Sequence, residues 1–225
     1  MIAPKAVLRA LATVRDPELD EPVTELGFID SIEVKDRTVH VRLRLPTYFC
    51  APNFAFMMVE DARRSVSGIE GVEAVRVSLI DHYASCEITE GVAAEEDFQQ
   101  SFPGEATGGL EEVRDLFRRK AFVARQERLA RSLAASQSEL ARLVVRDLPS
   151  GAATDAYLER RAELGIDCSA AAPFLVAPDG TAIPPAMLPA HLRFARTIGV
   201  SIEGNATFCR GLLQTRYANT QEVRT

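Results

Sequence analysis

Four cysteines are the residues of this 225-residue chain best suited to chemistry, and they are widely spaced. They are Cys50, Cys86, Cys168 and Cys209, and none of them belongs to a CxxC pair. A structural zinc site or a disulfide framework is built from cysteines in closely spaced sets. The spacing therefore predicts neither, and each thiol has to be considered by itself.

Cys50 stands in the loop of residues 46–51, directly before a helix that we expect to begin at Pro52. The unpaired N–H groups and the positive dipole end of such a helix favour a thiolate, the form that binds metals or attacks a disulfide. Cys50 is therefore the candidate functional thiol. The alternative is a free cysteine that fills an apolar gap beneath Phe49 and Phe54.

His82 and Cys86 follow a predicted strand and are four residues apart. At that separation two side chains share a face of either a strand or a helix, so both can reach one metal ion. Together with Cys50 they would provide three ligands, and the alternative is an ordinary pair at the edge of the core. Cys168 and Cys209 have no partner at metal-binding spacing, so core packing is the better interpretation for both.

Oxygen-bearing side chains also lie in loops that the fold can bring towards Cys50. Asp16-Pro17 ends a predicted helix, because the residue before a proline is pushed out of the α region. Asp16 and Glu18 are candidates to supply oxygen ligands or hydrogen bonds near Cys50. The alternative is a helix stop with solvated carboxylates, since Asp-Pro is a common turn signal. Thr47 is a candidate to orient the loop through its hydroxyl.

The hydrophobic pattern predicts which elements position these residues. Residues 39–45 alternate strictly between apolar side chains and His40, Arg42 and Arg44, which indicates a half-buried strand with its polar side chains on the open face. We expect a first helix over residues 4–14, a hairpin partner strand around residues 32–34, a helix over 52–67 and a third strand over 75–79. The order helix, strand, strand, helix, strand predicts a small α+β sandwich.

The composition changes after this first part of the chain. Residues 93–109 are acidic and then rich in Gly, Gln and Ser, which predicts a linker without enough apolar surface to order itself. We therefore expect a first domain over residues 1–92 and a second over residues 110–220. Helical spacing of apolar residues over 110–148, 154–164 and 185–198 predicts a mainly helical second domain, with a small hairpin over residues 173–184.

Several separated motifs resemble one family in order and spacing: DPEL at 16–19, VTELGFI at 23–29, the strand at 39–45, PTYFCAP at 46–52 and GVEAVRV at 71–77. The chain resembles the MIP18 family of iron–sulfur assembly domains, which includes SufT-type and PaaD-type proteins, over roughly residues 5–90. The resemblance implies an accessory protein that installs iron–sulfur clusters or iron, with Cys50 as the functional cysteine. The chain departs from the family pattern in having two residues between Thr47 and Cys50, and Ala51 before Pro52.

Charge and hydropathy narrow the set of partners. The chain has 26 Lys and Arg against 32 Asp and Glu, a net charge of −6, so we expect neither nucleic acid nor an anionic membrane as a partner. No apolar run is long enough for a membrane helix, and we expect a cytoplasmic protein. The resemblance implies a client metalloenzyme or other assembly proteins as partners, and transient binding of iron or an iron–sulfur cluster. A second copy of this chain, in a homodimer, is a further partner that the sequence allows.

These observations predict a maturation factor rather than an enzyme. No Ser, His and Asp set forms a catalytic motif, and no second cysteine lies near Cys50 in the sequence to resolve a disulfide. The mainly helical second domain would then recognise the client. The alternative is a chaperone or adaptor for a non-haem di-iron monooxygenase of the propane monooxygenase type, with no metal transfer of its own.

Overall fold

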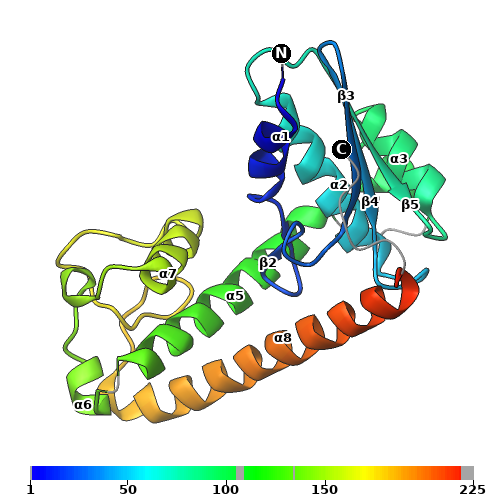
Figure 1. Ribbon diagram of the computed structural model, residues 1–225. Helices are drawn as coiled ribbons and strands as arrows, with labels where there is room; N and C mark the ends of the chain where they lie inside the picture. Colours follow the sequence, from blue (N-terminus) through cyan, green and yellow to red (C-terminus); the bar gives the residue numbers. More distant parts are fainter. Residues whose placement is uncertain (1, 105–108, 134, 219–225) are drawn as a thin grey trace. The chain divides into compact units, whose positions relative to one another are not determined.

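The computed structural model describes residues 2–104, 109–133 and 135–218 (Figure 1). Residues 105–108 of the predicted linker and residues 219–220 of the predicted second domain lie outside this range. The chain divides into two compact units, one formed by residues 1–113 with 204–225 and the other by residues 114–203. This division differs from the predicted one, because the described residues 204–218 belong to the first unit.

The first unit is the α+β domain that the hydrophobic pattern predicts. Its elements before residue 104 are α1 (Pro4–Leu11), β1 (Arg15–Asp16), β2 (Glu21–Pro22), β3 (Ile29–Lys35), β4 (Thr38–Arg44), α2 (Pro52–Ser67), β5 (Ala74–Ile80), α3 (Ser85–Ala93) and α4 (Phe98–Ser101). The predicted order of helix, strand, strand, helix, strand is confirmed, and α2 has the predicted bounds. The pattern did not predict the short β1–β2 ladder, α3 or α4.

The main sheet has the strand order β3-β4-β5. β3 and β4 form the predicted antiparallel hairpin, in which Lys35 pairs with Thr38 around a two-residue turn. β5 runs parallel to β4, and α2 provides the crossover that a parallel connection needs. The free edge of β5 is covered by α3, where the Thr89 hydroxyl accepts a hydrogen bond from the backbone N–H of Leu79 at 3.1 Å.

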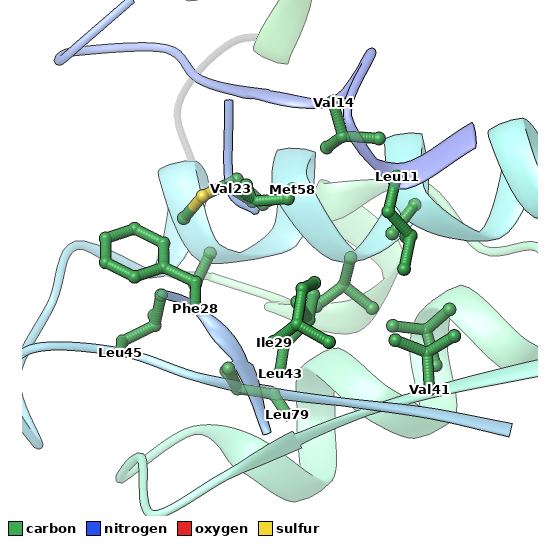
Figure 2. Close-up of a cluster of buried hydrophobic side chains, with 14 of the residues drawn as sticks. Leu11, Val14, Val23, Phe28, Ile29, Val41, Leu43, Leu45, Met58 and Leu79 are labelled. Atoms are coloured by element: carbon green, nitrogen blue, oxygen red, sulfur yellow. The ribbon is translucent and has the colours of Figure 1, made fainter. Parts of the chain in front are cut away.

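The core of this unit lies between the sheet and the helices α1 and α2 (Figure 2). The alternating apolar residues of β4 are fully buried, as predicted, and they meet side chains from α1, β3 and α2. The labelled members in Figure 2 are Leu11, Val14, Val23, Phe28, Ile29, Val41, Leu43, Leu45, Met58 and Leu79. Burying one such side chain contributes about 1.5–3 kcal/mol relative to exposure. This core fixes the strand and helix that carry the ends of the Cys50 loop.

Arg44 is buried, with 3% exposure, although the alternation places it on the open face of its strand. A register shift between Ile29 and Ser31 makes Asp30 an extra residue in β3, and such a bulge redirects a side chain. Asp30 Oδ1 lies 3.6 Å from Arg44 Nη1. The ring of Tyr217, from the end of the chain, lies 4.9 Å from the Arg44 guanidinium carbon. The open-face position expected for Arg44 is wrong, because Asp30 and Tyr217 cover it.

The predicted linker is ordered over residues 93–104. Asp97 caps α4 with a capping box, in which its carboxylate accepts a hydrogen bond from the backbone N–H of Gln100 at 2.8 Å. Phe98 packs edge-on against Phe56 of α2 at 5.5 Å between ring centroids, and Phe102 is buried. Two aromatic side chains therefore anchor a segment whose overall composition is polar.

The second unit is mainly helical, as expected. It contains most of α5 (Leu110–Ser132), then α6 (Gln137–Leu140), η1 (Val145–Asp147), α7 (Ala152–Glu163), η2 (Pro185–Met187) and the first part of α8 (Leu188–Arg216). The predicted hairpin is reduced to an isolated bridge between Val176 and Ala182. The core contains Phe122, Tyr157 and Phe174, stacked or edge-on at 5.4–5.6 Å between ring centroids. Arg125 of α5 is buried.

The last part of α8 completes the first unit. Ala206 and Leu213 belong to the same buried cluster as the residues of β3, β4 and α2. Gly27 has a φ of +76°, and a Cβ at this position would lie 3.1 Å from the Leu213 side chain. Glycine thus permits both the left-handed turn and the close approach of the helix. No helix in the described part of the chain is long and apolar enough to span a membrane.

Candidate functional site

Cys50 lies where the sequence predicts, at the end of the loop that leads into α2. Its thiol is half-buried. Ala51 is the N-cap of α2 and Pro52 the first helical residue, and no side chain of the N-cap satisfies the first N–H groups. The Thr47 hydroxyl lies 3.3 Å from Cys50 Sγ and also accepts a hydrogen bond from the backbone N–H of Phe49 at 3.2 Å. The Thr47 hydroxyl therefore contacts both the thiol and the backbone of the loop, and its orienting role stays a prediction.

His82 holds the backbone of the Cys50 loop. The backbone N–H of Ala84 points at His82 Nδ1 at 3.2 Å, so Nδ1 is the acceptor and Nε2 carries the hydrogen. Nε2 then donates to the Cys50 carbonyl oxygen at 2.7 Å. Burial lowers the pKa of His82 and outweighs the opposite effect of that hydrogen bond, and the charge of Arg216 lowers it further. His82 is therefore a neutral positioning residue.

The predicted ligand set of Cys50, His82 and Cys86 is not gathered around one point. Both ring nitrogens of His82 are engaged by backbone groups, and the Cys86 thiol, in the first turn of α3, is exposed. Among the residues that the structure describes, no group of three or more His, Cys, Asp or Glu side chains has a geometry suited to a metal ion. A metal bound at Cys50 would need ligands from elsewhere as well.

Asp16 is the buried last residue of β1, directly before the turn to β2. Its Oδ1 accepts hydrogen bonds from the backbone N–H groups of Glu18 and Leu19, both at 2.9 Å. Burial raises the pKa of Asp16 to about 6, against the effect of these hydrogen bonds. The Glu18 carboxylate accepts a hydrogen bond from Asn205 at 3.3 Å. Both carboxylates thus organise the turn that faces the end of α8, and neither is merely solvated.

The raised pKa of Asp16 predicts a pH-dependent stability. The unfolded carboxyl loses its proton near pH 3.8 and the folded one near pH 6, so between these values the folded protein binds more protons. The free energy of unfolding should therefore fall as the pH rises from about 4 to about 6, and level off above. Asp16→Asn keeps an acceptor oxygen and should remove this fall, as measured by denaturant unfolding across that pH range. Glu25→Gln, at an exposed carboxylate, should leave the fall unchanged; an unchanged profile in Asp16→Asn would contradict the assignment.

Cys209 packs against the core, as the sequence predicts. It is half-buried on α8 and packs, like Cys50, against the core of the first unit. Burial raises the pKa of the Cys209 thiol to about 11, and the negative charges of Asp16, Cys50 and Glu18 act in the same direction. The sequence contains a signal for the full length of α8. Ala206, Cys209 and Leu213 continue the helical apolar spacing beyond residue 198, where the predicted helix ends. The core position expected for Cys168 is wrong, since its side chain is exposed.

Three exposed aromatic side chains lie in the Cys50 loop and in the loop after β5. Tyr48, Phe49 and Tyr83 lie with ring centroids 5.0–6.3 Å apart, and Phe49 is 76% exposed. The backbone N–H of Tyr83 donates to the Tyr48 carbonyl oxygen at 3.1 Å, which joins the loop after β5 to the Cys50 loop. An apolar contact surface therefore borders the thiol.

Comparison with known proteins shows which family shares this domain. The family described as "Iron-sulfur cluster assembly protein" matches residues 4–79, from α1 to the end of β5. A Porphyromonas gingivalis protein named "Fe-S protein maturation auxiliary factor" is 35% identical over 74 residues, which cover 32% of this chain and 69% of that protein. An uncharacterized Methanocaldococcus jannaschii protein is 32% identical over 91 residues, 40% of this chain and 94% of the relative. This chain belongs to the iron–sulfur cluster assembly protein family.

The family domain also occurs inside larger proteins. The iron–sulfur cluster carrier protein of Mycobacterium tuberculosis is 41% identical over 75 residues, 33% of this chain. The chain spans about a fifth of the length of that relative, 19%. No solved structure gave a significant match. The membership predicted from the motifs is confirmed, and Cys50, at the predicted position in the family domain, stands in the loop that Thr47 and His82 hold.

Proposed function

We propose that this protein is a maturation factor that carries iron or an iron–sulfur cluster as cargo and delivers it to a client metalloenzyme. The observation that carries the proposal is the Cys50 thiol, half-exposed at the start of α2 in a domain of the iron–sulfur cluster assembly protein family. The relatives' names, "Iron-sulfur cluster carrier protein" and "Fe-S protein maturation auxiliary factor", support the same role. The protein would act without turnover of a substrate.

The loop is built to present one soft ligand at a defined place. Thiolate is the ligand that iron–sulfur clusters prefer, and a helix N-terminus stabilises its charge. His82 fixes the carbonyl of Cys50 and Thr47 contacts its sulfur, so the thiol has a set position before cargo arrives. A carrier with few ligands of its own leaves coordination positions that a client can fill. That property suits transfer more than storage.

Anaerobic titration with ferrous iron, alone and with sulfide, tests this proposal. The wild-type protein should bind iron stoichiometrically, and Cys50→Ala should lose that binding, as read by absorption spectra and metal analysis. Cys86→Ala is the matched control, because its thiol is exposed and its neighbour His82 is engaged elsewhere. Equal binding by wild type and Cys50→Ala, or binding by neither, would exclude cargo handling at Cys50.

An adaptor function is the second candidate. It is favoured by the lack of a three-ligand metal group in the described residues and by the aromatic patch of Tyr48, Phe49 and Tyr83. Such a protein would assist folding or assembly of a non-haem di-iron monooxygenase without moving metal. Cys50→Ala would then activate the client as well as wild type does, whereas a Phe49→Ser variant would not.

A further inference from the structure

The strands β4 and β5 lead into the two loops that meet at Cys50. Their parallel ladder ends at Arg44 of β4 and Ile80 of β5. The next residues, Leu45 and Asp81, are the points at which the two segments leave the sheet. A backbone carbonyl group beyond the last pair of a ladder needs a donor from another part of the chain or from water.

Arg216, the last residue of α8, donates to both of these carbonyl groups. Its Nη1 donates to the Leu45 carbonyl oxygen at 3.1 Å, and its Nη2 donates to the Asp81 carbonyl oxygen at 2.5 Å. A guanidinium group presents its donors in a fixed planar fork, so one side chain sets the spacing of the two acceptors. All of these residues belong to the first unit. Arg216 therefore joins the two loops at their base.

Tyr217 strengthens the contact between Arg216 and Asp81. Its hydroxyl donates to Asp81 Oδ2 at 3.0 Å, and its ring centroid lies 5.3 Å from the Arg216 guanidinium carbon. Asp81 has a φ of +53°, a left-handed conformation that is uncommon outside glycine. Such a conformation persists when the surrounding structure holds it. Here the residues at the end of α8 bind both the side chain and the carbonyl group of Asp81.

A short series of hydrogen bonds connects Asp81 to the backbone of the Cys50 loop. His82 directly follows Asp81 and donates from Nε2 to the Cys50 carbonyl oxygen at 2.7 Å. One residue further, the backbone N–H of Tyr83 donates to the Tyr48 carbonyl oxygen at 3.1 Å. A fixed position at the start of one loop therefore fixes how that loop meets the other.

Resting on the proposed function, we propose that Arg216 is a positioning residue for Cys50, which binds the base of both loops so that the thiol meets its cargo in one geometry. The family match covers residues 4–79 and does not include Arg216. The support for Cys50 thus comes partly from a segment that follows the whole second unit in the sequence. Arg216 acts through the backbone and does not itself contact the sulfur.

The metal-free full chain provides the first test. Arg216→Ala should raise both the hydrogen-exchange rate of the Tyr83 amide and the alkylation rate of Cys50 by about tenfold, because two charge-assisted hydrogen bonds no longer oppose local opening. Arg216→Lys keeps the charge but not the planar fork, so its rates should lie between those of Arg216→Ala and wild type. Arg210→Ala is the matched control, because it removes an arginine of the same helix that pairs with Glu21. Unchanged exchange in β3 and α1 would show that the loosening is local.

Binding of Fe²⁺ provides the second test. Loss of a residue that holds a metal ligand in place typically weakens metal binding by about 10–100-fold. Arg216→Ala should therefore bind Fe²⁺ at least about tenfold less tightly than wild type does. Arg210→Ala should bind Fe²⁺ as wild type does.

The outcomes separate this inference from the proposed function. Unchanged Tyr83 exchange and Cys50 alkylation in Arg216→Ala would overturn the inference, and so would an equal increase in Arg210→Ala. Wild-type Fe²⁺ affinity in Arg216→Ala, despite faster alkylation, would also overturn it. Faster exchange and alkylation in Arg216→Ala, with no Fe²⁺ bound by wild type, would instead overturn the carrier function and leave the positioning of the thiol by Arg216 standing.

Discussion

Asp30→Ala should lower the free energy of unfolding of the first unit by about 3–5 kcal/mol, because it leaves the buried charge of Arg44 without compensation. Both side chains are 4% exposed, and their charged atoms are 3.6 Å apart. Arg44 Nη1 has no hydrogen-bond acceptor among the described residues, so the carboxylate is its main electrostatic partner. The remaining contacts of Arg44, to the Gly27 carbonyl and the Tyr217 ring, cannot replace a full negative charge.

Denaturant unfolding, followed by a signal from the first unit, measures this effect. Glu33→Ala removes an exposed carboxylate from the same strand and should change stability by no more than about 0.5 kcal/mol. The double variant Asp30→Ala with Arg44→Met removes both charges and should recover much of the loss. If the double variant is no more stable than Asp30→Ala, the uncompensated charge is not the cause.

Arg161→Ala should destabilise the second unit by a similar amount, about 3–5 kcal/mol, while the first unit stays folded. Arg161 is 1% exposed. Its Nε donates to the Asp167 carbonyl at 2.6 Å, and its Nη1 donates to the Pro173 carbonyl at 2.9 Å and to the Tyr157 hydroxyl at 2.6 Å. These bonds connect the segment after α7 to the helix, and alanine would remove the donor that the three acceptors share.

Hydrogen exchange resolved by unit is the appropriate measurement, because the two units need not unfold together. Protection should fall over residues 157–176 and remain in β3 to β5. Arg193→Ala removes an exposed arginine from the same unit and serves as the control for loss of charge. Equal protection in Arg161→Ala and Arg193→Ala would show that the buried hydrogen bonds contribute little.

The fold of the family domain was predictable where local signals were strong. Alternation over residues 39–45 predicted β4, and Pro52 with Gly68 predicted α2 with its observed bounds. The Cys50 loop followed from these two elements, since it is the segment that joins them. Periodicity and turn residues act over a few positions, and here they agree with the tertiary structure.

Long-range packing explains what local patterns did not predict. The local alternation predicts Arg44 on the open face of its strand. It does not show the residues that cover Arg44, which are a bulge at Asp30 and Tyr217, 173 residues later in the chain. Phe98 and Phe102 anchor a segment of polar composition through a contact with Phe56. Cys209 packs against the core of the first unit because the last part of α8 belongs to that unit. In these cases the surroundings of the side chain come from residues that are remote in the sequence.

The return of α8 to the first unit has a consequence for the order of events during synthesis. Ala206 and Leu213 fill the core of the family domain, yet the ribosome makes them after the whole second unit, residues 114–203. Part of the apolar surface of the nascent domain therefore stays uncovered while about ninety further residues are added. At ordinary elongation rates this takes several seconds. During that interval the Cys50 loop lacks its α8 neighbour. A protein that meets the chain on the ribosome would encounter the Cys50 loop before Arg216 of α8 has bound the Leu45 carbonyl that precedes this loop.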